Sequence, residues 1–151
     1  MMKKTFLILL LFISSCGYQP IYVNKSIKEF EFKKITLEGD NDVNKKIVNT
    51  LSIKENEETE NLNRLIISSL LESNEISKNS KGQVELYRTI VNVNLKIIND
   101  NNQIIQEKNF SKELVYNDKD NKFSLVEYQN SIKNNLIDKI ISDIIIYLNL
   151  Q

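Results

Sequence analysis

The sequence predicts an α+β fold in which two helices pack on one face of a four-stranded, mostly antiparallel sheet, in the order β-α-β-β-β-α. Apolar and polar residues alternate through residues 87–97, which is the period of a strand with one buried face. Apolar residues recur every three or four positions through residues 124–149, which is the period of an amphipathic helix. The sheet face and the helix stripe can both be buried if they pack against each other.

The first strand and the first helix are expected within residues 30–53. The strand carries four apolar residues, Phe30, Phe32, Ile35 and Leu37, and Gly39 with Asp40 ends it. Val43, Ile47 and Leu51 then recur every four residues, which predicts a helix over residues 42–53. Three residues at its start have capping side chains: Asp40, Asn41 and Asp42.

Three further strands are expected after a polar, acidic loop at residues 54–61. Residues 62–71 are dense in aliphatic side chains and predict a strand, whereas residues 73–83 predict only weak structure. The third strand has a face made of Tyr87, Thr89, Val91, Val93, Leu95 and Ile97. A turn of Asn and Asp at residues 99–102 leads to a fourth strand, whose in-phase residues are Ile104, Phe110, Leu114 and Tyr116. These three strands form a meander.

The last helix is expected to begin at Ser124, because Ser124 and Glu127 have the spacing of a capping box. Its stripe should pack Leu136, Ile140 and Ile144 on three residues of the third strand, Val91, Val93 and Leu95. The apolar run near its end is too short to cross a membrane, and Asp143 interrupts it.

The N-terminus has the features of a bacterial lipoprotein signal. Two lysines precede a short apolar run, and Ile13, Ser14, Ser15 and Cys16 resemble a lipobox. In such signals the cysteine thiol receives a diacylglyceryl group, cleavage occurs before the cysteine, and a fatty acid such as palmitate acylates the new amino group. Three acyl chains anchor a protein stably. The alternative is an ordinary signal peptide followed by a chance cysteine.

This interpretation divides the chain into a signal peptide (residues 1–15), a tether that begins at the lipidated Cys16 (residues 16–28) and a single α+β domain (residues 29–151). Position 17 is Gly rather than Asp. By resemblance to the sorting rules of enteric bacteria, that residue permits transfer to the outer membrane.

The composition argues against several functions. The chain has no His and one Cys, so it offers no Cys/His nucleophile and no zinc ligand set. Its three glycines form no phosphate-binding loop, and its net charge of zero is not that of a nucleic-acid-binding domain. We therefore expect no catalytic residue, no metal, no cofactor and no nucleic-acid partner.

The stretch "CGYQPIY", residues 16–22, resembles the start of the mature chain in the LPS-assembly lipoprotein family (LptE), which reads Cys-Gly-aromatic-x-Pro-Leu-Tyr. Residues 86–100 are similar to the family's Tyr-containing strand and Asp turn, and "VYN", residues 115–117, precedes the long helix in a similar way. The resemblance implies a Gram-negative envelope protein, held by its lipid anchor at the periplasmic face of the outer membrane. It also implies a role in envelope biogenesis without enzymatic activity: plugging a large β-barrel, helping that barrel to assemble, and assisting lipopolysaccharide delivery to the surface.

Lipopolysaccharide carries phosphates, so basic residues on the sheet are its candidate ligands. Arg88 and Lys96 share the polar face of the third strand, about 27 Å apart. Their candidate neighbours are Lys108 and Lys112 on the fourth strand and Arg64 on the second. Arg88 is preferred because a guanidinium binds phosphate in a bidentate manner, and reversing the charge of Arg88 together with Lys112 should weaken lipopolysaccharide binding.

Three alternatives remain open from the sequence. The five cations could be ordinary solvated charges that protect the sheet from aggregation. The chain could be a lipid-anchored, periplasm-facing envelope protein with another binding partner. It could also be a lipid-anchored enzyme such as a hydrolase, although a nucleophile and base are not evident.

Overall fold

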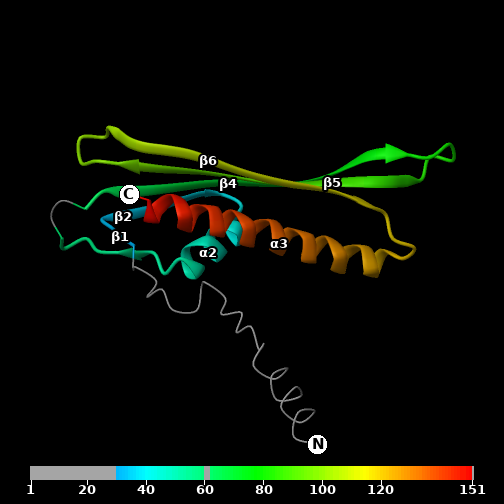
Figure 1. The fold of residues 1–151 in the computed structure, drawn as a ribbon, viewed down its shortest axis with the longest axis horizontal. Coiled ribbons are helices and arrows are strands. Elements are labelled where there is room, and N and C mark those ends of the chain that lie inside the picture. The colour runs from blue at the N-terminus through cyan, green and yellow to red at the C-terminus, as the bar shows by residue number, and fades with distance from the viewer. Residues whose placement is uncertain (1–29, 60–61, 151) are drawn as a thin grey trace, which may run out of the picture.

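The structure is a computed structural model that describes residues 30–59 and 62–150. It confirms the predicted α+β class (Figure 1). In chain order the elements are β1 (Glu31–Phe32), β2 (Lys34–Gly39), α2 (Asn41–Thr50), β3 (Lys54–Glu55), β4 (Arg64–Lys78), β5 (Val84–Ile98), β6 (Ile104–Asn117) and α3 (Lys122–Asn149). The predicted signal peptide, Cys16 and the tether lie outside the described residues.

The four-stranded sheet has the order β2-β4-β5-β6. Strands β4, β5 and β6 form the predicted antiparallel meander, whereas β2 pairs parallel with β4 because α2 carries the chain back across the sheet between them. Both helices cover the same side of the sheet (Figure 1). We call this side the helix face and the other side the open face. A short parallel pair, β1 with β3, was not predicted.

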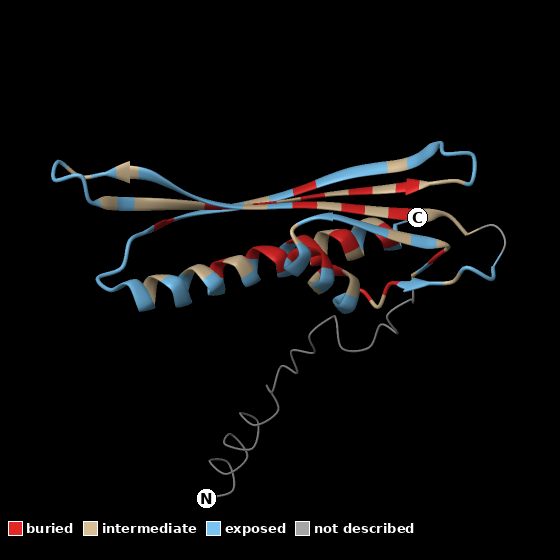
Figure 2. Cartoon of the chain, turned by 180° about the vertical axis from the view of Figure 1, so that it is seen from behind, coloured by how far each residue is buried: buried red, intermediate tan, exposed pale blue. Residues whose placement is uncertain are grey.

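The core lies between the helix face and the two helices. The predicted packing group is buried together in one cluster: Leu136, Ile140, Ile144, Val91, Val93 and Leu95 are each no more than 2% exposed. Figure 2 shows the buried residues on the sheet-facing side of α3 and along the central strands. Burial of apolar surface of this kind is the main term that stabilises a domain.

Strand β4 continues to Lys78, seven residues beyond the predicted end, so the expectation of weak structure over residues 73–83 is wrong for its first part. The polar residues there pair with β5, apart from a bulge near Ser77. The hydroxyl groups of Ser73 and Thr89 lie 2.5 Å apart, and Thr89 Oγ1 lies 3.0 Å from the Tyr116 hydroxyl oxygen. A hydrogen-bonded polar row therefore extends the sheet beyond its apolar part.

Both helices are capped by residues just before them. Asp40 caps α2, since its carboxylate accepts a 2.9 Å hydrogen bond from the Val43 N–H, and the helix ends at Thr50 rather than at residue 53. The predicted capping box of α3 is wrong. Asn121 is the cap, and its side chain accepts a 2.7 Å hydrogen bond from the Ser124 N–H. Ser124 already lies in the first turn.

The predicted phase of the fourth strand is only partly correct. Phe110 and Tyr116 are buried, and Leu114 lies on the same helix face opposite Thr89 although it is 41% exposed; Ile104 is out of phase and 53% exposed. A register shift between Ile97 and Ile98 changes the phase, so that Ile104 pairs with Ile98 on the open face. The apolar phase of β6 therefore begins after this shift.

Candidate functional site: the sheet cations and a groove beside β6

The five candidate cations lie on opposite faces of the sheet. Directly paired residues of neighbouring strands share a face. Lys108 pairs with Leu95 and Lys112 pairs with Val91, so both lysines are on the helix face. The other three candidates are on the open face: Arg64, Arg88 and Lys96. The expectation that Lys108 and Lys112 are neighbours of Arg88 and Lys96 is therefore wrong.

Lys112 is neutralised by the long helix. Its Nζ lies 2.7 Å from the Asp143 Oδ2 atom, and both side chains are partly exposed. The pair connects the edge strand β6 to α3. The positive charge of Lys112 is therefore compensated within the protein.

Lys96 is compensated by Glu107 across the β5–β6 pair. The Lys96 Nζ lies 3.2 Å from Glu107 Oε1, which also accepts a 3.0 Å hydrogen bond from Asn94 Nδ2. The hydrogen bond from Asn94, followed by the contact with Lys96, holds the pKa of Glu107 below its ordinary value. Glu107 therefore stays ionised at neutral pH, and Lys96 is not a free cation.

Arg64 holds the β5–β6 turn. One of its terminal nitrogens donates to the Asn99 carbonyl oxygen, at 3.3 Å, and to the Asn102 side-chain oxygen. Asn102 has a positive φ of 61° in that turn, which Asn tolerates better than most residues. The contacts of Arg64 indicate a structural role at the end of the sheet.

Arg88 is the one open-face candidate without a partner among the described residues. It is half-buried, and its buried Nε makes no hydrogen bond within the described part of the chain. The next row of the open face carries Glu72 and Glu113 on either side of Ile90. Diagonal neighbours of this kind are about 7–8 Å apart, so two carboxylates reduce the positive potential at Arg88.

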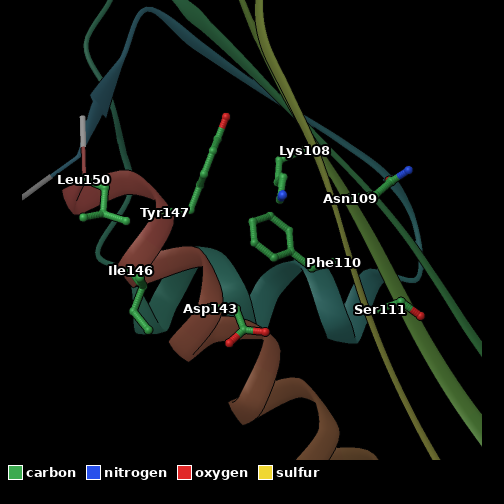
Figure 3. A pocket seen from close by; sticks show the side chains of 8 residues that line it. All are labelled: Lys108, Asn109, Phe110, Ser111, Asp143, Ile146, Tyr147 and Leu150. Carbon is green, nitrogen blue, oxygen red and sulfur yellow. The ribbon is translucent and has the colours of Figure 1, made fainter.

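A groove of about 420 Å³ lies between β6 and the last turns of α3 (Figure 3). Its lining residues are Lys108, Asn109, Phe110, Ser111, Asp143, Ile146, Tyr147 and Leu150. The rings of Phe110 and Tyr147 meet edge to face at 5.8 Å, and Ile146 remains 51% exposed. This volume is within the range of ligand-binding pockets, about 300–1,000 Å³.

Lys108 is the uncompensated charge of this groove. It is exposed and has no hydrogen bond or ion pair to any described residue, whereas Asp143 is paired with Lys112. The groove was not predicted, because it requires the position of α3 relative to β6. The sequence contained part of this information: Lys108 lies two positions before the buried Phe110, so the two side chains face the same side of the strand.

Other kinds of site are not evident in the described ranges. Within residues 30–59 and 62–150, no group of acidic or cysteine side chains could hold a metal ion. No helix of the same ranges has both the length and the hydropathy needed to cross a membrane.

No protein-family model and no curated protein sequence matches the chain. Solved structures do match it. Rare lipoprotein B from Shewanella oneidensis superposes with a TM-score of 0.53 at 14% identity, covering 78% of this chain and 98% of that one. The chain shares its fold with this lipoprotein. It also matches lipoprotein B from Nitrosomonas europaea, with a TM-score of 0.55 at 11% identity over 84% of this chain and 88% of that one. A minor lipoprotein from Acinetobacter baumannii gives 0.51 at 14% identity over 77% and 90%.

Proposed function

We propose that this protein is an outer-membrane lipoprotein of the LPS-assembly type. It is anchored through Cys16 on the periplasmic face, plugs and helps to assemble a lipopolysaccharide-translocating β-barrel, and assists lipopolysaccharide delivery to the cell surface. It acts by binding rather than by catalysis.

The observation that carries this proposal is the agreement between two independent features. The N-terminal "CGYQPIY" stretch resembles the start of mature LPS-assembly lipoproteins. The described domain matches nearly the whole length of rare lipoprotein B from Shewanella oneidensis, which is itself a lipoprotein. A generic lipoprotein would need only the lipobox and not this fold.

The open face gives the proposed plug a suitable surface. Its central row is polar: Ser68, Asn94 and Asn109 lie side by side, with Glu38 of β2 beyond Ser68, and Asn94 donates a 2.8 Å hydrogen bond to Asn109. The interior of a transmembrane barrel is itself polar and hydrated. A hydrated, mixed-charge sheet face can therefore lie against the barrel wall while its charged side chains stay in contact with water.

The experiment for the barrel role is depletion of this protein followed by measurement of outer-membrane barrel levels. We expect one large barrel protein to be lost or poorly assembled, and the same barrel to co-purify with the tagged lipoprotein. Normal levels of every large barrel would instead favour a lipid-anchored protein with another envelope partner.

The anchor gives a separate prediction. Cys16→Ala should leave an uncleaved precursor, because the thiol that accepts the diacylglyceryl group is missing. Mass spectrometry of the membrane fraction should then show no acylated N-terminus. Cys16→Ala protein that is cleaved and partitions like the wild type would contradict lipidation at this residue.

The lipid contact is a third prediction. Arg88 and Lys112 lie on opposite faces of the sheet, so Arg88 is tested alone rather than together with Lys112. Arg88→Glu should weaken lipopolysaccharide binding by about tenfold. A charge-assisted contact contributes about 1.5–3 kcal/mol, and we expect the low end of this range because the two nearby glutamates already repel an anion. Lys96→Glu is the matched control on the same strand and face, because Lys96 is already paired. Equal binding by wild type and Arg88→Glu would remove Arg88 from the proposed lipid site and leave the barrel role untouched.

A further inference from the structure

Strand β6 is the outer edge of the sheet over its full length. It pairs with β5 on one side, and no described residue pairs with it on the other. An edge strand with free backbone groups is a template for a further strand. The groove described above runs beside this free edge.

The backbone groups that face outward can be identified from the register. The Asp118 N–H donates to the Glu85 carbonyl at 2.9 Å, so even-numbered residues of this part of β6 direct their backbone groups toward β5. By the alternation of an antiparallel pair, Asn109 and Ser111 direct theirs outward. Both residues line the groove although their side chains belong to the open face, and Figure 3 shows the Asn109 side chain directed away from Tyr147. The groove therefore borders on unpaired N–H and C=O groups.

The opposite wall of the groove belongs to α3 and carries two large apolar side chains beside Asp143, which is paired with Lys112. Ile146 and Tyr147 stand on the flank of the helix that β6 leaves uncovered. A fifth strand beside β6 would lie over this flank, because successive strands are about 4.7–4.9 Å apart. Its inward side chains would then contact Ile146, Tyr147 and the uncompensated Lys108.

We propose that the outer edge of β6 and the adjoining groove bind an extended segment of a partner protein by strand addition. The segment carries an acidic residue opposite Lys108 and an aliphatic or aromatic residue opposite Phe110. These two residues are two positions apart, because alternate residues of a strand face the same way. The main chain supplies hydrogen bonds to Asn109 and Ser111, and the two inward side chains supply selectivity.

The backbone edge favours a peptide over a lipid. An acyl chain in this groove would cover the outward N–H and C=O groups of β6 without pairing them, and unpaired buried polar groups are unfavourable. A strand pairs these groups and fills the apolar part of the groove at the same time.

The charges disfavour two other occupants. In a second copy of this chain, an antiparallel pair of β6 edges centred on Phe110 would place Lys108 of one copy near Lys112 of the other. The chain's own tether, residues 16–28, contains two lysines and no acidic residue. Neither would supply the anion that Lys108 lacks.

The test uses the full chain in phosphatidylcholine nanodiscs and a labelled synthetic peptide. In this peptide every second residue is threonine, which faces away from the groove. The residues between the threonines face the groove, and one aspartate and one isoleucine occupy two neighbouring groove-facing positions, separated by a single threonine. A second peptide replaces the aspartate with lysine, and a third is a scramble that breaks the alternation. Fluorescence anisotropy gives the affinities, and hydrogen exchange follows the amides of Asn109 and Ser111.

We expect the aspartate peptide to bind most tightly and to slow exchange at both amides. Lys108→Glu should weaken the aspartate peptide by about tenfold and should favour the lysine peptide instead. Ser111→Pro should weaken both alternating peptides by about tenfold, since it removes an outward N–H that β5 does not use. Ser111→Ala keeps the N–H and is the matched control. If Ser111→Pro does not fold, a peptide N-methylated at its edge-facing amides tests the same hydrogen bonds on the unaltered protein.

Three outcomes would overturn the proposal. Equal affinity for the aspartate, lysine and scrambled peptides would show that neither the charge nor the alternation is recognised. Binding to phosphatidylglycerol vesicles that depends on Lys108 but is unchanged by Ser111→Pro would identify a lipid groove. Self-association in sedimentation that Ser111→Pro abolishes would identify a second copy as the occupant. The proposal goes beyond the lipopolysaccharide role and does not depend on it.

Discussion

Ile140→Ala is expected to lower the free energy of unfolding by about 2–5 kcal/mol, measured by urea denaturation. Ile140 has no exposed surface and belongs to the core between α3 and the helix face. Truncation removes buried methyl and methylene groups and leaves a cavity that the neighbouring strands cannot fully close. The loss should be seen as a lower midpoint with little change in the slope against urea.

The matched control is Ile146→Ala, six residues further along the same helix. Ile146 is 51% exposed at the rim of the groove, so its truncation should change stability by less than about 1 kcal/mol. A similar loss for both variants would mean that α3 does not bury the face that the structure shows. Equal stability of Ile140→Ala and wild type would contradict the core assignment directly.

The elements with a clear period were predictable from the sequence. The alternation in β5 and the three- and four-residue spacing in α3 gave both elements, and their apolar residues are buried together. Local periodicity was sufficient because each element buries one continuous face.

The second half of β4 could not be predicted in this way. Its sequence after Leu71 is largely polar and has no apolar alternation, so nothing local distinguishes it from a loop. It is a strand because β5 is long enough to pair with it and because Ser73 and Thr89 satisfy each other's hydroxyl groups. Tertiary pairing therefore decided the conformation here, as it often does for strands.

For the sheet cations, odd or even position along a strand predicts which face each side chain occupies, but it does not predict which residue of α3 that side chain contacts. Lys108, Phe110 and Lys112 have the same parity, so the sequence already implied that the two lysines share a face with a buried aromatic residue. The pairing of Lys112 with Asp143 could not be predicted, because it depends on how far α3 is rotated about its own axis. The same rotation leaves Ile146 uncovered and opens the groove beside Lys108.

Gly39→Ala is expected to destabilise the protein by on the order of 3–5 kcal/mol, measured by thermal or urea unfolding. Gly39 joins β2 to α2 with a φ of 84°, a conformation that favours glycine. A Cβ atom added there would lie 1.8 Å from the carbonyl oxygen of Ser69 on β4. The same oxygen accepts a 3.1 Å hydrogen bond from the N–H of Asp40, the cap of α2, so the backbone cannot move away without loosening both the sheet and the helix start.

Gly82→Ala separates the two causes of this effect. Gly82 has nearly the same φ, 80°, but a Cβ atom there would meet nothing within 4 Å, so only the dihedral strain should appear, about 1–2 kcal/mol. The difference between the two variants therefore measures the steric contact between β2 and β4. Equal effects would mean that these strands do not approach as closely at Gly39 as the parallel register requires. A larger effect at Gly39 would support that register, in which Gly39 pairs with Ser69.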